Sequence, residues 1–315
     1  MKGDGRMNRR EFIKSAAALA AVSGLSGRRT TAAEGGRILF GACRGPDDVK
    51  LMASIGYGFW EWNVGAAFAP EKDAEWWKAR RDKIAALPLP LRSCNGFIPS
   101  KFRLTGPKAD HAPALAYAET ALRRAEEVGV KTVVFGSGGA RNVPGDFTIA
   151  GQVPDLERGV TQYAGFCREL CRRVADLKTV QVVIEPLRPN ESNIVNYVWQ
   201  GVQICEDVNS PRLAQLADVF HMMMGRESAA SIVAADKWLK HCHIASYGTR
   251  SFPGSDPETV GLLRPYFAAL RSIGYAGGVS CECGWGEAKD LEKNLETALK
   301  TLKGLICWTS SVATS

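Results

Sequence analysis

Short apolar runs alternate with amphipathic helical stretches along most of the chain. The apolar runs predict strands at 37–43, 58–63, 91–97, 131–136, 179–185, 213–218, 240–245 and 277–283. Between them, apolar residues recur three and four apart, as in 110–128, and this spacing predicts helices. Eight strand–helix alternations in about 280 residues match the size of a (β/α)8 TIM barrel. The pattern therefore predicts an α/β fold of this architecture.

A doubly wound open sheet is the alternative fold. That fold would place a G-x-G-x-x-G fingerprint after the first strand, and the segment GACRGPDD at 41–48 lacks it. No Pro/Gly-rich linker or low-complexity segment divides the chain after residue 33. We therefore expect a single barrel domain over residues 34–315.

The last four predicted strands end on residues that bind metals or transfer protons. They are Glu185, Asp218, His243 and Glu282, in chain order. In a TIM barrel the carboxyl ends of the strands meet at one mouth, where the active site lies. Three carboxylates and one imidazole suit Mn²⁺, with Mg²⁺, Co²⁺ or Zn²⁺ as alternatives. The sequence thus predicts one divalent metal ion held by these four side chains.

Other polar residues fall near the same strand ends. Glu61 lies in the second predicted strand, and Asn95 in the third. His241 shares a strand face with His243, so we expect it one layer deeper in the barrel, behind the metal ligands. Nine cysteines are present, none in a C-x-x-C pair, and most are interpreted as small buried side chains.

The basic charge of the sequence is concentrated at its start. The formal net charge is +7, and residues 1–33 hold seven basic and two acidic residues, so the remaining chain carries only about +2. A nucleic-acid-binding domain would carry a broad basic surface. We therefore expect no nucleic-acid partner.

The leader MNRREFIKSAAALAAVSGLSG resembles a twin-arginine signal peptide, with Arg9 and Arg10 before a short apolar run. That run is shorter than the ~20 residues that span a bilayer, so no stable membrane insertion is expected. Residues 1–33 are predicted to bind the twin-arginine export machinery, which would deliver the protein to the periplasm or the cell exterior. A basic, frayed N-terminal helix is the alternative.

Several motifs together are similar to the sugar isomerase/epimerase family with a xylose isomerase-like barrel. They are IEPLRPNES, LADVFHM, HCHIA followed by TRSFPG, and GYAGGVSCECGW, and the likeness extends over about residues 37–305. The branch closest in motif is that of the D-tagatose and D-psicose 3-epimerases. The resemblance implies a metal-dependent enzyme that moves a proton next to a carbonyl group through an enediolate.

Residue roles follow from the same resemblance. It implies that Glu185 and Glu282 bind the metal and also act as the acid/base pair. It implies substrate contacts for Glu191, His221 and Arg250, with a carbohydrate as the substrate, and it allows for a homo-oligomer. The family often carries an acidic residue after the seventh strand, where this chain has Ser246 and Tyr247. The resemblance therefore does not identify which sugar is the substrate.

Three alternatives to an isomerase or epimerase remain at this level. A trinuclear-zinc DNA-repair endonuclease shares the motif but needs further histidines on strands two and three, and His111 lies in a predicted helix. A lyase, dehydratase or C-glycoside-cleaving enzyme would use the same metal and base. An exported sugar-binding protein without turnover would keep only the pocket.

Overall fold

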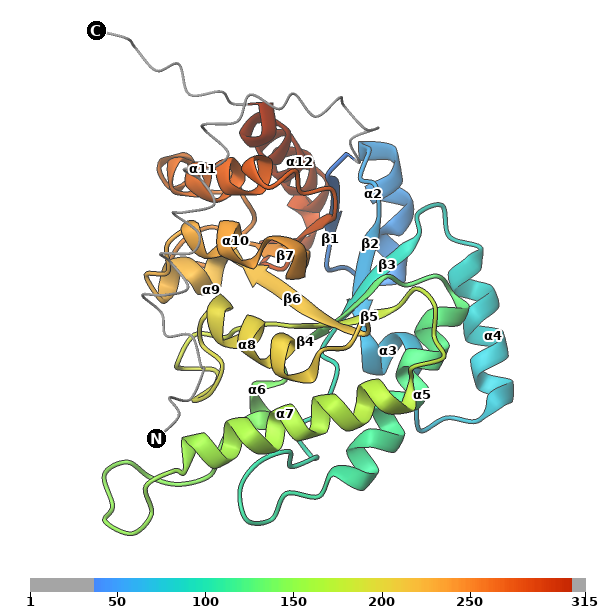
Figure 1. Cartoon of the computed structure of the whole chain (residues 1–315). Helices are drawn as coiled ribbons and strands as arrows, with labels where there is room; N and C mark the ends of the chain where they lie inside the picture. The colour runs from blue at the N-terminus through green and yellow to red at the C-terminus, as the bar shows by residue number, and fades with distance from the viewer. Residues whose placement is uncertain (1–36, 308–315) are drawn as a thin grey trace, which may run out of the picture.

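The computed structural model describes residues 37–307 and places eight parallel strands inside a ring of helices (Figure 1). The strands are β1 (Leu39–Ala42), β2 (Trp60–Asn63), β3 (Leu91–Asn95), β4 (Thr132–Phe135), β5 (Gln181–Ile184), β6 (Leu213–Asp218), β7 (Leu239–Ile244) and β8 (Gly278–Cys281). Each agrees with its predicted range to within two residues at either end. The predicted fold class is confirmed.

Helices follow the strands in chain order. They are α2 (Val49–Ile55), α3 (Val64–Phe68), α4 (Ala74–Ala85), α5 (His111–Glu127), α6 (Gly138–Arg141), α7 (Leu156–Arg173), α8 (Val198–Val208), α9 (Val219–Met224), α10 (Ala230–Ala235), α11 (Pro257–Ser272) and α12 (Leu291–Cys307), with short 3-10 helices at Pro46–Asp48, Asp236–Trp238 and Ala288–Asp290. Four of the longer helices begin after an aspartate whose carboxylate accepts a backbone N–H, which fixes where they start: Asp73, Asp110, Asp155 and Asp256.

The strands pair in the order β1-β8-β7-β6-β5-β4-β3-β2, and every pair is parallel. The two ends of this sheet meet through a single bridge between Cys43 and Glu61, where Arg44 N donates to Glu61 O at 3.0 Å. The sheet is thus a nearly closed barrel. Because all eight strands are parallel, their carboxyl ends lie together at one mouth of the barrel.

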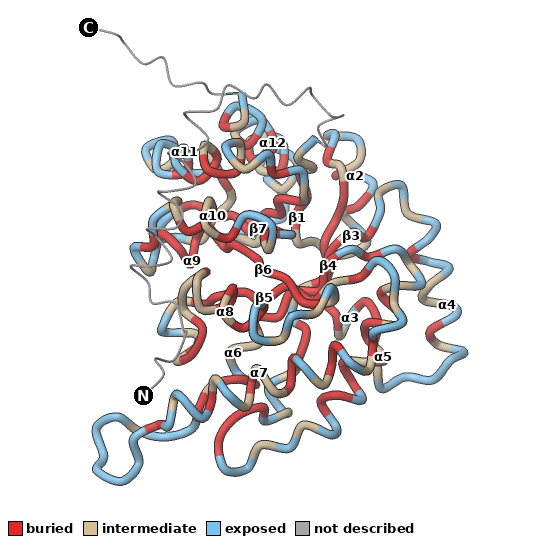
Figure 2. Tube along the Cα trace, viewed as in Figure 1, coloured by how far each residue is buried: buried red, intermediate tan, exposed pale blue. Residues whose placement is uncertain are grey.

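The strands are buried on both faces (Figure 2). Their outward side chains pack against the helices in one large apolar core. A separate apolar cluster lies among the strands at the centre of the barrel and consists of Val134, Val183, Ala214 and Leu216. The barrel interior is therefore packed with side chains, as expected for this architecture.

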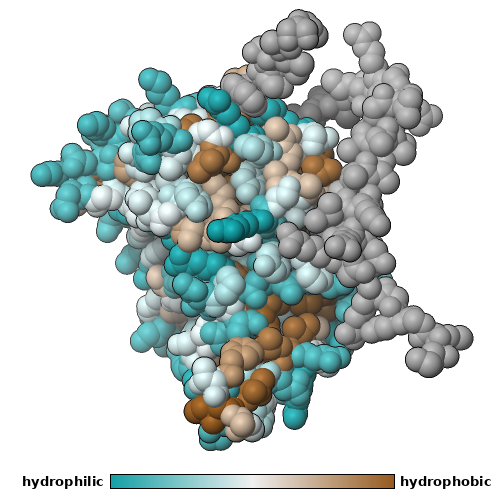
Figure 3. All heavy atoms as spheres, turned by 90° about the vertical axis from the view of Figure 1, so that its left-hand side faces the viewer, coloured by the Kyte–Doolittle hydropathy of each residue, from teal (hydrophilic) through white to brown (hydrophobic). Residues whose placement is uncertain are grey.

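The segment between α6 and α7 projects from the body (Figure 1). It carries the exposed side chains Phe147, Ile149 and Val153. Figure 3 shows hydrophobic surface toward the lower end of one face of the molecule. All nine cysteines lie within residues 37–307, and each is a free thiol. The predicted signal peptide lies outside the described residues. No helix in the described part of the chain has the length and apolar character to cross a membrane.

Candidate metal centre at the barrel mouth

Four consecutive strands deliver the four predicted metal ligands to one place. Glu185 follows β5 directly, and Pro186 after it cannot continue the ladder because it lacks an N–H. Asp218 ends β6 and caps α9, since its carboxylate accepts the backbone N–H of His221 at 3.1 Å. His243 lies within β7. Glu282 follows β8 and still pairs with β7 through its backbone N–H.

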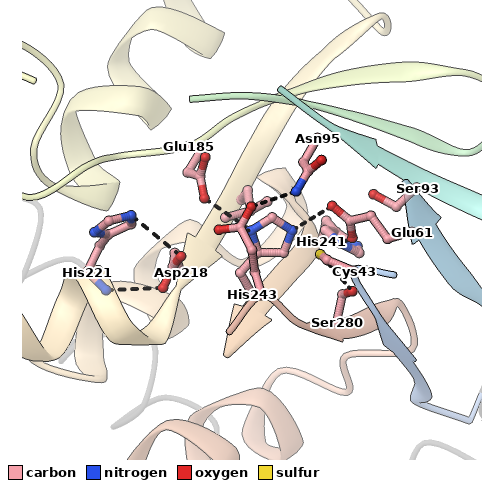
Figure 4. Close-up of polar contacts among 12 residues, drawn as sticks. Cys43, Glu61, Ser93, Asn95, Glu185, Asp218, His221, His241, His243 and Ser280 are labelled. Carbon is pink, nitrogen blue, oxygen red and sulfur yellow. Dashed lines mark hydrogen bonds and ion pairs between the residues drawn. The ribbon is translucent and has the colours of Figure 1, made fainter. Parts of the chain in front are cut away.

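The ligand atoms of Glu185, Asp218, His243 and Glu282 all lie within 4.8 Å of one another. His243 Nδ1 is 3.1 Å from Glu185 Oε1 and 3.5 Å from Glu282 Oε2. Figure 4 shows the imidazole of His243 between the carboxylates of Glu185 and Glu61. The structure therefore brings the four predicted ligands into one cluster. Their role as ligands remains a prediction.

The cluster holds more negative charge than its own cations neutralise. Burial would lower the pKa of His243, but the carboxylates of Glu61, Glu282 and Glu185 raise it well above its usual value. Burial, and then repulsion from Glu282, raises the pKa of Glu185. Burial also acts to raise the pKa of Glu282, but His243 and Arg250 outweigh it and lower that pKa to about 2. Surplus negative charge of this kind favours a bound cation.

The donor set fits a divalent metal ion. Carboxylate oxygens and an imidazole nitrogen are ligands that Mn²⁺, Mg²⁺, Co²⁺ and Zn²⁺ all accept. The four groups come from the last four strands at the mouth, where a substrate can enter. We therefore describe Glu185, Asp218, His243 and Glu282 as the candidate metal centre.

The three predicted substrate-binding residues surround the candidate metal centre. Arg250 Nη2 donates to Glu282 Oε2 at 2.6 Å, and its Nη1 donates to Glu191 Oε1 at 3.2 Å. His221 Nε2 lies 3.6 Å from Asp218 Oδ2 and makes no hydrogen bond with any described residue, although it is buried. The structure thus places all three beside the cluster. An unpartnered buried nitrogen is the kind of group that a substrate oxygen completes.

Arg188 also lies beside the candidate metal centre and was not predicted from the sequence. Together with Glu191, His221 and Arg250 it forms what we call the rim. Arg188 Nε donates to Glu191 Oε1 at 2.8 Å, and its guanidinium lies 5.2 Å from the ring centre of Phe220. Arg250 lies 5.1 Å from the same ring. The signal for Arg188 was its position between Glu185 and Glu191 in the motif IEPLRPNES.

Glu61, His241 and Asn95 also contact the candidate ligands. Asn95 Nδ2 donates to Glu282 Oε1 at 2.7 Å. Glu61 is fully buried and accepts from the Nε2 atoms of His241 and His243, each at 2.9 Å. Burial would raise the pKa of Glu61, but these two imidazoles outweigh it and hold that pKa below its usual range.

Arg141, which follows a glycine-rich turn, contacts the protein rather than the barrel mouth. It is fully buried and donates to Phe135 O, Ser192 Oγ and Val195 O. Its guanidinium also lies 5.6 Å from the ring centre of Tyr163. This arrangement gives Arg141 a structural role beneath the segment that carries Glu191.

The histidines that a trinuclear-zinc endonuclease requires are missing from the ends of β2 and β3. β2 contains Glu61 and ends at Asn63, and β3 ends at Asn95. His111 lies in the first turn of α5, where its Nε2 contacts Leu104 O at 2.8 Å. The other histidines among residues 37–307 are His221, His241 and His243, which come from β7 and from α9 after β6. The geometry therefore supports one metal ion more readily than three.

Fold and site together define a parallel (β/α)8 barrel protein with a carboxylate–imidazole cluster at its mouth. The family model of the xylose isomerase-like TIM barrel matches residues 49–305 of this chain. The chain belongs to the xylose isomerase-like TIM barrel family.

One curated relative is a probable ketose 3-epimerase from Synechocystis, which is 31% identical over 113 residues, 36% of this chain and 38% of that protein. The chain spans about two fifths of the length of the curated relatives it matches. Two solved structures share the fold. D-psicose 3-epimerase from Clostridium cellulolyticum has a TM-score of 0.72 at 18% identity over 85% of this chain and 99% of that one. A 3-keto-D-glucoside 4-epimerase from E. coli has a TM-score of 0.69 at 19% identity over the same shares.

Proposed function

We propose that this protein is a divalent-metal-dependent sugar isomerase or epimerase that moves a proton at a carbon next to a carbonyl group. The observation that carries the proposal is the grouping of Glu185, Asp218, His243 and Glu282 within 4.8 Å at the barrel mouth. The names of its relatives, ketose 3-epimerase and 3-keto-glucoside 4-epimerase, support a ketose or keto-glycoside as substrate.

Glu185, Asp218, His243 and Glu282 would hold the metal ion, with Mn²⁺ as the first expectation. When bound, such an ion stabilises the negative charge that develops on the substrate oxygens as a proton leaves the neighbouring carbon. The mixed oxygen and nitrogen donors support a metal of this group and do not distinguish among its members.

Glu185 and Glu282 would transfer the proton. They follow β5 and β8, so they approach a substrate at the mouth from two different sides. Epimerisation inverts a carbon, and it needs one group that removes a proton from one face and another that returns a proton to the opposite face. Because the reaction is reversible, each carboxylate serves as base in one direction and as acid in the other.

The rim residues would orient the sugar. Arg250 contacts both Glu282 and Glu191, so it links the proton-transfer group to the predicted substrate contact. His221 Nε2 is buried and has no described hydrogen-bond partner, so it is free to donate to a carbonyl or hydroxyl oxygen. Positioning of this kind supplies a large part of the rate in proton transfer at carbon.

The proposal is tested by deuterium incorporation from D₂O. The protein, loaded with Mn²⁺, is incubated with D-tagatose, D-psicose, D-fructose, L-ribulose and a 3-keto-glucoside, and NMR locates the label. Deuterium at C3 or C4 with inversion is the expected result for an epimerase, and deuterium at C1 or C2 is expected for an isomerase. EDTA should abolish both.

Other outcomes identify the alternative functions. Loss of a ring or glycosidic substituent with label uptake would replace the proposal with a lyase or C-glycoside-cleaving enzyme. Sugar binding without exchange, at full metal occupancy, would favour a binding protein. Exchange that persists after complete metal removal would contradict metal dependence.

The proposal includes export through the twin-arginine machinery. The paired Arg9 and Arg10 before an apolar run support it, and the near-neutral body is compatible with a periplasmic enzyme. Replacing both arginines with lysine should retain the full-length precursor in the cytoplasm, as cell fractionation would measure. Light scattering of the mature protein would establish whether it is a homo-oligomer.

A further inference from the structure

Glu61 joins two histidines at the centre of the barrel. Its Oε1 lies 2.9 Å from His243 Nε2, and its Oε2 lies 2.9 Å from His241 Nε2. All three side chains are almost completely buried. Figure 4 shows Glu61 on the β2 side of His243, opposite Glu185. A carboxylate buried this deeply without partners would be strongly destabilising, so the two contacts explain how it is accommodated.

This arrangement determines which nitrogen of His243 faces the candidate metal centre. A carboxylate accepts hydrogen bonds, and its geometry here matches donation from the Nε2 atoms of His241 and His243 to the two oxygens of Glu61. His243 then presents Nδ1 to the opposite side, where Glu185 Oε1 lies at 3.1 Å and Glu282 Oε2 at 3.5 Å. A bound metal ion would take the place of a proton on Nδ1, since a histidine binds a metal through an unprotonated nitrogen.

His241 supports the same contact from below. Its Nε2 forms a hydrogen bond with the second carboxylate oxygen of Glu61, and its ring packs edge-on against the ring of His243 with the ring centres 5.2 Å apart. Glu61 itself is fixed by the main chain of β2, which pairs with β3 on one side and bridges to Cys43 on the other. The carboxylate therefore has little freedom to move away from His243.

We propose that Glu61 and His241 are positioning residues for the metal site: Glu61 fixes the tautomer and ring orientation of His243, and His241 holds Glu61 in place. This inference rests on the proposed metal-dependent function. Hydrogen-bonded partners behind a metal-binding histidine generally change metal affinity by about 10- to 100-fold. Glu61 and His241 contact each other and His243, so we expect their effect to reach the metal site through His243.

A second metal ion is the competing interpretation. Ligand atoms of Glu61, His241 and His243 also lie within 4.8 Å of one another. In that case Glu61 would be a ligand, and the chain would bind two ions. In the positioning interpretation it binds one. The number of ions bound per chain therefore separates the two interpretations.

The experiment measures binding of Mn²⁺ and Co²⁺ by competition with a chelator, and the visible spectrum of the Co²⁺-loaded protein. The variants are Glu61→Gln, His241→Leu, His241→Gln and Thr132→Val. Thr132 is a buried residue inside the barrel whose hydroxyl donates to Ser93 Oγ, so Thr132→Val removes a buried hydrogen bond that does not involve His243. Urea unfolding of the metal-free proteins reports stability separately.

We expect the wild type to bind one ion, and Glu61→Gln to bind it 10- to 100-fold more weakly with an altered Co²⁺ spectrum. His241→Leu should weaken binding less, because one contact to Glu61 is lost and the carboxylate stays. His241→Gln should recover part of this loss, since its amide can donate to Glu61 Oε2 from the place of Nε2. Thr132→Val should stay within about twofold of the wild type, because His243 is untouched.

The other outcomes distinguish this inference from the proposed function. Unchanged affinity and an unchanged spectrum in Glu61→Gln, with one ion in the wild type, would overturn the positioning role and leave the metal-dependent function intact. Two ions per wild-type chain, and one in Glu61→Gln, would assign Glu61 as a ligand and overturn it as well. No metal binding by the wild type would overturn the proposed function itself. If Glu61→Gln fails to fold, the difference between His241→Leu and His241→Gln decides.

Discussion

The interior of the barrel has two unlike halves. Between β4, β5 and β6 it contains the apolar cluster of Val134, Val183, Ala214 and Leu216. Between β1, β2, β7 and β8 the interior side chains include Cys43, Glu61, His241 and Ser280, which are polar or titratable. All of these side chains are buried except Cys43, which is half-buried. The difference is one of chemistry rather than exposure.

We infer that the apolar half mainly stabilises the fold and that the polar half mainly orients the groups of the candidate metal centre. Packing apolar side chains in the barrel centre stabilises the fold in proportion to the area they bury. A buried polar group stabilises little unless it is fully hydrogen-bonded, so it is retained where it orients another group. Substitutions in the two halves should therefore separate stability from metal affinity and activity.

The largest effect is expected at the mouth above the polar half, in Glu282→Gln. Glu282 accepts from Asn95 and Arg250 and is proposed to transfer the substrate proton. Removing a general base typically costs 10²–10⁴ in rate, so deuterium exchange should fall by about that factor. The control is Glu287→Gln, the same change at an exposed residue a few positions later, which should leave exchange unchanged. Exchange retained in Glu282→Gln would remove Glu282 from the acid/base pair.

Leu216→Ala tests the apolar half. Leu216 is fully buried on β6 and packs with Val183 and Ala214. Deleting its side chain should lower the free energy of unfolding by about 2–5 kcal/mol, because a cavity replaces packed atoms. Urea unfolding measures the loss, and Mn²⁺ affinity of the folded protein should stay within about twofold. Leu262→Ala, on an exposed part of α11, is the matched control. A large loss of metal affinity in Leu216→Ala would contradict the separation of the two halves.

The fold could be predicted from sequence because each strand carries its own local signal. The run at 179–185 is mostly apolar, of strand length, and followed by a proline, and the structure places β5 at Gln181–Ile184. Eight repeats of such signals left few architectures to choose from. The ends of the strands moved by one or two residues because a barrel pairs only as much of each run as its neighbours allow.

The candidate site was predictable only in part. Four polar residues interrupt or end apolar strand runs and could therefore be recognised from the sequence: Glu185, Asp218, His243 and Glu282. Glu61 also stood out, but its contacts with His241 and His243 join residues 180 and more positions apart, which no local pattern reports. Arg188 could have been found from its charge in the motif, whereas its contact with Glu191 depends on how the loop folds.

Asn193→Ala tests how the segment above the apolar half is held. Asn193 accepts from Val143 N and donates to Val143 O, each at 2.9 Å, and so joins the loop that carries Glu191 to the segment after β4. Losing two such hydrogen bonds should cost about 1–3 kcal/mol of stability and raise the substrate KM, because Glu191 is less well placed. Asn190→Ala, an exposed neighbour in the same loop, should change neither quantity. Lower stability with an unchanged KM would show that Glu191 does not depend on this connection.

The smallest effect is expected at the opposite end of the apolar half, where Glu126 on α5 fixes the start of β5. Its carboxylate accepts from the backbone N–H groups of Lys178, Thr179 and Val180 and from the Thr179 hydroxyl, at 2.8–3.1 Å. Burial would raise the pKa of Glu126, but these hydrogen bonds outweigh it and lower that pKa. A lowered pKa means that the folded state binds this proton more weakly than the unfolded state does.

The stabilisation from Glu126 is therefore complete above the unfolded pKa of about 4.3 and disappears as the pH falls through the lower pKa of the folded state. Glu126→Gln should reduce stability at pH 6 by less than about 1 kcal/mol, because solvent screens this partly exposed site. The deficit should shrink toward pH 3, as urea midpoints at several pH values would show. Glu296→Gln, at an exposed position on α12 with no hydrogen bond to its carboxylate from any described residue, is the control and should follow the wild type. A deficit that stays constant from pH 6 to pH 3 would mean that the stabilisation by these hydrogen bonds does not depend on the negative charge of the Glu126 carboxylate.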